Sequence, residues 1–228
     1  MVEFLFLDLD DTILDFHKAE HIALSKTFRS FGLEPTQEVL DRYSIINRAH
    51  WQRLERKELT REQVVVGRFA TLFQERDIQA DPVEVAAKYE DFLSQGHYFL
   101  PGAEDALKRL SSKYKLYLAS NGTAKVQAGR LESSGIGQYF EEIFVSQDMG
   151  ANKPDKVYFD RCGEKIPGYD PSKAMMVGDS LTSDIQGGIN AGMRTVWVNA
   201  RGETPPAHII PDYEIKALSQ LEELLENL

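Results

Sequence analysis

The chain has 228 residues, of which 42% are hydrophobic, 10% aromatic and 27% charged. These fractions are typical of a globular protein and exclude collagen-like, low-complexity and largely disordered chains. Lys and Arg number 26 against 36 Asp and Glu, which gives a net charge of −10. Nucleic acids and anionic membranes bind basic surfaces, so this charge argues against both as partners. A small anionic substrate stays open, because a bound cation can reverse the potential inside one cleft.

The sequence also bears on the compartment in which the protein works. Its single cysteine, Cys162, allows no internal disulfide, which favours a reducing environment. No segment approaches the roughly 20 apolar residues of a membrane helix. The first residues lack the basic stretch with which a signal peptide begins. We therefore expect a cytoplasmic protein without a membrane span.

Predicted strands and helices alternate over most of the chain. The apolar run from Val2 to Leu9 is typical of a strand buried on both faces of a parallel sheet. Similar runs lie at 115–119, 142–145, 174–177 and 195–198, and helical patterns lie at 103–110, 124–133, 156–165, 181–191 and 217–228. This alternation predicts an α/β fold with a doubly wound, Rossmann-like parallel sheet.

Residues 15–100 break the alternation, because they contain helical patterns and no convincing strand. These patterns cover 18–31, 37–56, 61–76 and 83–95. Thr36, Thr60 and Asp81 stand where helix N-caps belong. We therefore expect an all-helical cap domain, residues 15–100, inserted into an α/β core made of residues 1–14 and 101–228.

Acidic residues lie at or just beyond the carboxyl ends of predicted strands, namely Asp8, Asp10, Asp179 and Asp184. Ligands of open α/β sheets bind at this edge, so we expect the carboxylates to face one cleft. Two unit charges about 4 Å apart repel by about 4 kcal/mol at an effective dielectric of 20, and a divalent cation removes that cost. Oxygen ligands without a His or Cys set favour Mg²⁺ over zinc. The cation would then attract an anionic substrate, most simply a phosphate.

Two more groups complete an ordered set of motifs. Ser120 ends the second predicted strand, and Lys153 lies just before a helix that Pro154 can begin. In chain order, Asp8-Leu9-Asp10-Asp11-Thr12, Ser120, Lys153, and Gly178-Asp179 with Asp184 resemble the four motifs of the haloacid dehalogenase-like phosphohydrolase superfamily. The resemblance covers essentially the whole chain, and the helical insert resembles that superfamily's small helical cap.

The resemblance implies hydrolysis through an aspartyl-phosphate. Asp8 would be the nucleophile, and Asp10 would protonate the leaving oxygen and then deprotonate the attacking water. Asp8, the backbone carbonyl of Asp10 and Asp179 would bind Mg²⁺, with Asp184 supporting these ligands. A simpler role stays open for Asp184, which could stabilise the first turn of its helix.

For the phosphate, the resemblance implies binding by the second and third motifs. Ser120 and the backbone N–H of Asn121 would bind a phosphoryl oxygen, and Lys153 would offset the negative charge. Ser120 could instead be an ordinary hydroxyl at a strand end.

Two stretches, residues 47–51 with 67–69 and residues 184–192, resemble the bacterial pyrimidine 5′-nucleotidase branch of the superfamily. That branch implies nucleoside 5′-monophosphates as substrates, which could be bound by stacking or polar contacts from Phe16, Asn47, Trp51 and Arg68. Simpler roles stay open here as well. Trp51 could be a core residue of the cap, and Arg68 could form an interhelical ion pair.

Other activities of the same fold are alternatives. They are a phosphatase of another small metabolite such as phosphoglycolate or a sugar phosphate, a phosphosugar mutase, and a 2-haloacid dehalogenase. A dehalogenase needs no Mg²⁺, and the second carboxylate, Asp10, counts against it. A non-enzymatic regulatory protein would have lost the nucleophile, whereas Asp8 is present. The sequence thus predicts a Mg²⁺-dependent phosphomonoesterase whose partner is a small phosphorylated metabolite.

Overall fold

The computed structural model describes residues 2–228, which form two compact units. The core unit contains the described chain up to Phe16 together with His97–Leu228, and the helical unit is His17–Gly96. The helical unit thus begins at residue 17 and ends at 96, where the sequence analysis set the cap at 15–100. No helix among residues 2–228 is long and apolar enough to cross a membrane.

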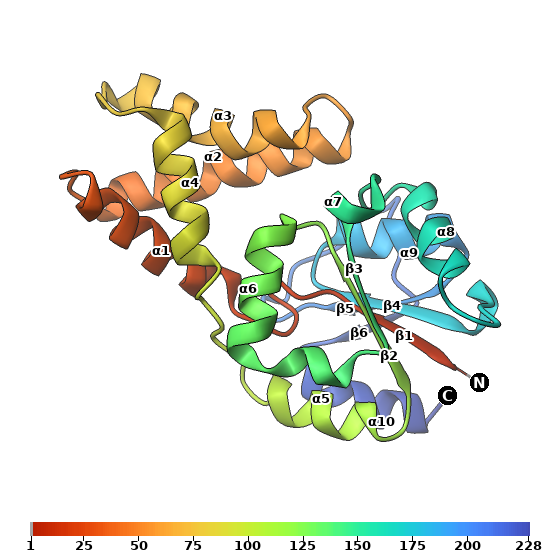
Figure 1. Cartoon of the computed structure of the whole chain (residues 1–228). Coiled ribbons are helices and arrows are strands. Elements are labelled where there is room, and N and C mark those ends of the chain that lie inside the picture. The colour runs from red at the N-terminus through yellow and green to blue at the C-terminus, as the bar shows by residue number, and fades with distance from the viewer. Residues whose placement is uncertain (1) are drawn as a thin grey trace. The chain divides into compact units, whose positions relative to one another are not determined.

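A parallel sheet organises the core unit (Figure 1). Its strands are β1 (Phe4–Leu7), β2 (Lys115–Ser120), β3 (Glu142–Val145), β4 (Ala174–Gly178), β5 (Arg194–Val198) and β6 (Tyr213–Ile215), in the order β3-β2-β1-β4-β5-β6. Every neighbouring pair is parallel, and Leu5 aligns with Leu116 on one side and Met175 on the other. The strand order reverses between β1 and β4, which makes this point the topological switch of the sheet. The predicted doubly wound α/β fold is confirmed.

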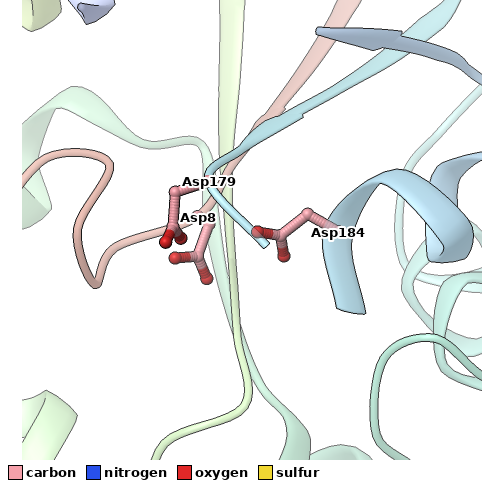
Figure 2. Close-up of side chains that lie close together, drawn as sticks. All are labelled: Asp8, Asp179 and Asp184. Atoms are coloured by element: carbon pink, nitrogen blue, oxygen red, sulfur yellow. The ribbon is translucent and has the colours of Figure 1, made fainter. Parts of the chain in front are cut away.

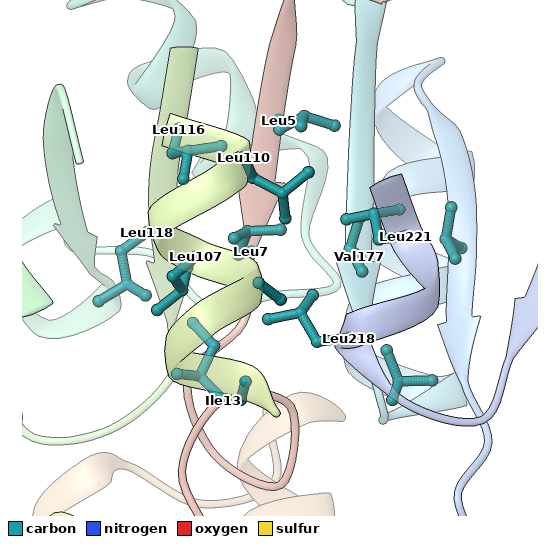
Figure 3. Packing of buried hydrophobic residues seen from close by; sticks show 14 of the residues in the cluster. Leu5, Leu7, Ile13, Leu107, Leu110, Leu116, Leu118, Val177, Leu218 and Leu221 are labelled. Atoms are coloured by element: carbon teal, nitrogen blue, oxygen red, sulfur yellow. The ribbon is translucent and has the colours of Figure 1, made fainter. Parts of the chain in front are cut away.

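Helices cover both faces of this sheet (Figure 1). They are α5 (Ala103–Ser111), α6 (Ala124–Ser134), α7 (Ser146–Met149), α8 (Lys156–Glu164), α9 (Gln186–Ala191) and α10 (Leu221–Glu226). Successive strand residues point to opposite faces. Leu5 and Leu7 of β1 join an aliphatic cluster with α5 and α10 (Figure 3), whereas Phe4 and Phe6 join an aromatic-rich cluster with α8. Burial on both faces explains why the strands read as continuous apolar runs.

The helical unit is built from α1 (Phe16–Ser30), α2 (Gln37–Glu55), α3 (Arg61–Arg76) and α4 (Pro82–Leu93), and α1 begins at the last residue of the core unit. Its sequence marks the helix starts clearly. The side chains of Thr36, Thr60 and Asp81 accept backbone N–H bonds at the starts of α2, α3 and α4, as predicted. Such caps satisfy N–H groups that have no partner within the helix.

Some short elements differ from the sequence predictions. The four-residue helix α7 and the three-residue strand β6 were not expected. The tail contains a 3₁₀ turn, Leu218–Gln220, before α10, where one continuous helix was predicted. Residues Leu181–Ile185 form a π-helical turn in place of the regular helix predicted there.

Candidate active site

Three carboxylates meet at the carboxyl edge of the sheet (Figure 2). Asp8 follows β1, Asp179 follows β4, and Asp184 lies in the π-helical turn that comes next. One oxygen of each lies within 4.8 Å of the others. The backbone N–H of Asp8 donates to the carbonyl of Val177 at 2.9 Å, which extends the pairing of β1 with β4. The switch point of the sheet therefore holds the carboxylates together.

The ammonium group of Lys153 bonds to two of these carboxylates. Its Nζ donates to Oδ1 of Asp8 at 2.7 Å, to Oδ1 of Asp184 at 2.7 Å and to the carbonyl of Ala119 at 2.5 Å. Lys153 is 1% exposed, so its three N–H donors all go to protein acceptors. A single ammonium group thus lies among three carboxyl groups.

Burial and the neighbouring charges shift the pKa values of the acidic groups. Burial raises the pKa of Asp8 to about 8, against the opposing effect of Lys153 and with added repulsion from Asp184 and Asp10. Burial, followed by repulsion from Asp184 and Asp8, also raises the pKa of Asp179 well above its usual value. Burial alone would lower the pKa of Lys153, but Asp184 and Asp8 outweigh it and hold that pKa above its usual value. The ammonium therefore stays charged without neutralising the cluster.

The cluster fits a hard divalent cation. Asp8, Asp179 and Asp184 offer oxygen donors only, which suits Mg²⁺ and not a zinc site of His and Cys. Repulsion from neighbouring carboxylates adds to burial in raising the pKa values of Asp8 and Asp179, and a bound cation would relieve that repulsion. The side chain of Asp10 lies outside this group, so any contribution of Asp10 to a metal site would come from its backbone.

Gly178 makes room for the carboxylate of Asp184. A Cβ atom at position 178 would overlap that carboxylate, so the end of β4 requires a residue without a side chain. The second oxygen of Asp184 accepts the backbone N–H of Ser180 at 3.0 Å. Asp184 is consequently 1% exposed and held by bonds at both of its oxygens.

Asn121 connects the end of β2 to the loop that carries Lys153. Its Oδ1 accepts the backbone N–H of Lys153 at 2.9 Å, and its Nδ2 donates to the carbonyl of the same residue at 2.9 Å. Nδ2 also donates to Oγ of Ser183 at 3.1 Å. The prediction from the sequence concerned only the backbone N–H of Asn121, and the structure adds a positioning role for its side chain.

Ser120 and Asp10 meet beside α6. Oγ of Ser120 accepts hydrogen bonds from Nε2 of Gln127 at 2.7 Å and from the backbone N–H of Gly122 at 3.1 Å. The same Nε2 donates to Oδ2 of Asp10 at 2.8 Å, and Nη1 of Arg130 donates to Oδ1 of Asp10. Gln127 and Arg130 were not among the site residues predicted from the sequence. The available signal was their polarity among the apolar positions of the predicted helix.

Two of the candidate substrate-binding residues lie inside the helical unit. Asn47 is 3% exposed and Arg68 is 2% exposed. Nδ2 of Asn47 donates to Oε1 of Glu20 at 2.7 Å, and Nη1 of Arg68 donates to Oδ1 of Asn47 at 2.9 Å. This buried chain of contacts joins α1, α2 and α3, and it favours a structural role for both residues.

The aromatic candidates are less buried. Trp51 is half-buried on α2, and the guanidinium of Arg61 lies 5.6 Å from the centre of its ring. Phe16, also half-buried, belongs to the core unit, and the guanidinium of Arg130 lies 5.9 Å from the centre of its ring. Both rings lie against cations within their own unit.

Several known proteins are similar to this chain along most of its length. The sequence profile of the haloacid dehalogenase-like hydrolases matches residues 5–198. The HAD hydrolase YfnB from Bacillus subtilis is 39% identical over 97% of this chain and 94% of its own length. The YfnB structure described as bound to magnesium superposes with a TM-score of 0.94 over 98% of both chains.

Two further relatives carry a more specific name. The pyrimidine 5′-nucleotidase PynA from Streptococcus pneumoniae is 37% identical over 98% of this chain and 95% of its own. The pyrimidine 5′-nucleotidase YjjG from Escherichia coli is 31% identical over 98% of this chain and 97% of its own. With the motif order, the parallel sheet and similarity along nearly the whole length in agreement, the chain belongs to the haloacid dehalogenase-like hydrolase family.

Proposed function

We propose that the protein is a Mg²⁺-dependent phosphomonoesterase that hydrolyses nucleoside 5′-monophosphates, with pyrimidine nucleotides preferred. The observation that carries the proposal is the cluster of Asp8, Asp179 and Asp184 around the buried ammonium of Lys153. The names of PynA and YjjG support the choice of a pyrimidine nucleotide. Asp8, Asp179, Asp184 and the backbone carbonyl of Asp10 would hold Mg²⁺. When bound, the cation would offset the charge of the phosphate.

In the first step, a carboxylate oxygen of Asp8 attacks phosphorus. A bond forms between that oxygen and phosphorus, and the bond from phosphorus to the nucleoside oxygen breaks. Asp10 gives its proton to the departing oxygen, so the nucleoside leaves as a neutral alcohol. Lys153 bonds to Oδ1 of Asp8, which fixes the orientation of the nucleophile.

In the second step, water hydrolyses the phosphorylated Asp8. Asp10, now ionised, takes a proton from the water as its oxygen bonds to phosphorus. The bond between phosphorus and Asp8 breaks, and inorganic phosphate leaves. A hydroxyl that accepts two hydrogen bonds keeps one proton to donate, so Ser120 is suited to bind a phosphoryl oxygen in both steps.

For the base, Trp51 and Phe16 are the candidates that could stack on a pyrimidine ring. Asn47 lies one helical turn before Trp51 on α2, and its bonds to Glu20 and Arg68 hold that helix in the unit. We therefore assign Asn47 and Arg68 a structural role within the helical unit.

The test is phosphate release from a panel of compounds, with Mg²⁺ and with a chelator. The panel contains pyrimidine and purine nucleoside 5′-monophosphates, sugar phosphates and phosphoglycolate. We expect the highest kcat/KM with pyrimidine nucleotides, no release in chelator, and no turnover by Asp8→Asn at unchanged thermal stability. Undiminished release after metal removal would contradict the proposal. Isomerisation of a sugar phosphate or halide release from a 2-haloacid would assign a mutase or a dehalogenase instead.

A further inference from the structure

Two buried polar residues of α6, Gln127 and Arg130, have no role in the chemistry described above. They lie one helical turn apart and are 1% and 0% exposed. Their neighbours Val126 and Leu131 are buried apolar residues on the same helix. A buried guanidinium or amide is costly unless it is paired, so the partners of these two groups indicate what they do.

Both groups bond to Asp10. The two amide N–H donors of Gln127 go to Oγ of Ser120 at 2.7 Å and to Oδ2 of Asp10 at 2.8 Å. Nη1 of Arg130 donates to Oδ1 of Asp10 and to Oε1 of Gln127, the latter at 3.3 Å. Each oxygen of Asp10 therefore has its own donor from α6, and a single amide joins Asp10 to Ser120.

The backbone beside Ser120 leaves space for the side-chain amide of Gln127. A Cβ atom at Gly122 would overlap the side chain of Gln127, so the contact between Gln127 and Ser120 needs a glycine two residues after the serine. Asp10 has a side chain that is 28% exposed. It thus stands at the boundary between the buried donors of α6 and the solvent.

We propose that Gln127 and Arg130 are positioning residues for the reaction, which hold the carboxylate of Asp10 at a fixed place beside the hydroxyl of Ser120. The inference rests on the proposed function, since it takes Asp10 as the acid and base and Ser120 as a phosphate-binding group. Arg130 donates to Asp10 and not to Ser120, whereas Gln127 donates to both residues. Substitutions of Arg130 and of Gln127 should therefore change the kinetic constants in different ways.

The first experiment compares two leaving groups in Arg130→Met. The value of kcat/KM reports the first chemical step, in which a nucleoside needs a proton from Asp10 and nitrophenolate does not. General acid catalysis is typically worth about 10²–10⁴-fold, and misplacing the acid should remove part of this. We expect kcat/KM for a nucleoside 5′-monophosphate to fall about 10–100-fold, and kcat/KM for p-nitrophenyl phosphate to change less than about threefold. Arg130→Lys, which keeps a cationic donor, should recover part of the loss.

The second experiment uses Gln127→Leu, which removes both donors at similar size. Since Ser120 also loses one of its two hydrogen-bond donors, we expect KM to rise for both phosphate esters, together with the selective loss on the nucleotide. Gly122→Ala displaces the same amide and should cause the same rise in KM and the same selective loss on the nucleotide. It replaces Gln127→Leu in the experiment if that variant does not fold.

Thr195→Val is the matched control for lost stability. Thr195 is buried near the amino end of β5, and its hydroxyl donates to Oδ2 of Asp212 at 2.9 Å, away from the catalytic edge. We expect a lowered melting temperature and unchanged kcat/KM on both substrates. Equal losses on both substrates in Arg130→Met, or no loss on either, would overturn the inference. A wild-type protein that hydrolyses neither ester would overturn the proposed function instead.

Discussion

Asp8 and Asp10 stand two residues apart in the chain, yet their carboxylates have different surroundings. The side chain of Asp8 is 10% exposed and bonds to Lys153, whereas the side chain of Asp10 is 28% exposed and bonds to Gln127 and Arg130. Paired carboxylates in different environments can take different chemical roles. Their surroundings therefore suit Asp8 to act as the nucleophile and Asp10 to transfer protons.

Asp10→Asn tests this division directly. The variant keeps Asp8 but lacks the acid of the first step and the base of the second. Nitrophenolate leaves without a proton, so we expect a burst of nitrophenol and phosphate accumulating on Asp8. Nucleotide hydrolysis should slow by about 10²–10⁴-fold. Rapid quench followed by mass spectrometry of the peptide that contains Asp8 measures the intermediate. Linear release of nitrophenol from the first turnover, with no phosphate mass added to Asp8, would show that another residue is the base of the second step.

The site could be read from the sequence only in part. Motif order and strand ends predicted that Asp8, Asp179, Asp184 and Lys153 belong together, and the structure brings these four into one cluster. The contacts of Gln127, Arg130 and the Asn121 side chain were not predictable in this way. They depend on how α6 and the Lys153 loop pack against the ends of the strands, and no local pattern encodes that packing.

Among the elements, the buried strands were predicted well because their apolar runs are continuous. The first predicted strand is too long, because the stretch from Val2 to Leu9 begins and ends with apolar residues whereas strand β1 covers only Phe4–Leu7. Strand β6 was missed because it has three residues and pairs with β5 alone. The π-helical turn was missed because the N–H of Ile185 donates to the carbonyl of Ser180, five residues earlier, a choice that apolar periodicity does not reveal.

At the end of β4, we expect Gly178→Ala to damage activity. The added methyl group would push Asp184 away from Lys153, and overpacking of this kind typically costs about 1–3 kcal/mol of stability. Loss of a preorganised electrostatic group typically costs about 10²–10³-fold in kcat. Gly137→Ala is the matched control, because a Cβ atom there meets only Cδ1 of Ile143 at an ordinary 3.9 Å. Normal kcat in Gly178→Ala would show that Asp184 tolerates displacement.

On the scale of the whole molecule, the chain leaves the core unit after Phe16 and returns to it at His97. The helical unit has its own buried polar network around Glu20, and the core unit carries the carboxylate cluster. Burial raises the pKa of Asp8 to about 8 from its ordinary 3.8. Folding of the core unit is therefore linked to pH and to cation binding.

The sign of this linkage follows from proton binding. Between the ordinary pKa of 3.8 and about 8, the metal-free folded protein holds a proton on Asp8 that the unfolded chain releases. The free energy of unfolding of the metal-free protein should therefore fall as pH rises through this window. Asp179, whose pKa is also raised, contributes in the same direction.

Mg²⁺ should reverse this loss, because it binds the ionised carboxylates. A ligand at about 100 times its Kd adds about 2.7 kcal/mol of stability, and protons compete less for the site at higher pH. We expect the difference in melting temperature with and without Mg²⁺ to widen from about pH 5.5 to about pH 8. Differential scanning calorimetry measures it, with Asp8→Asn as the control in which the widening shrinks. A difference that is constant across this range would contradict the linkage.

The indole of Trp197 gives the cation site a built-in optical reporter. Trp197 is 2% exposed, and its Nε1–H donates to the backbone carbonyl of Asp179 at 2.8 Å. The chain has two tryptophans, and Trp51 lies in the helical unit, so Trp51→Phe leaves Trp197 as the one tryptophan, bonded to a proposed metal ligand. Titration of this variant with Mg²⁺ should change the emission of Trp197 with a saturable dependence, and Asp179→Asn should abolish the change. Cation affinity could then be followed without substrate, turnover or an attached dye.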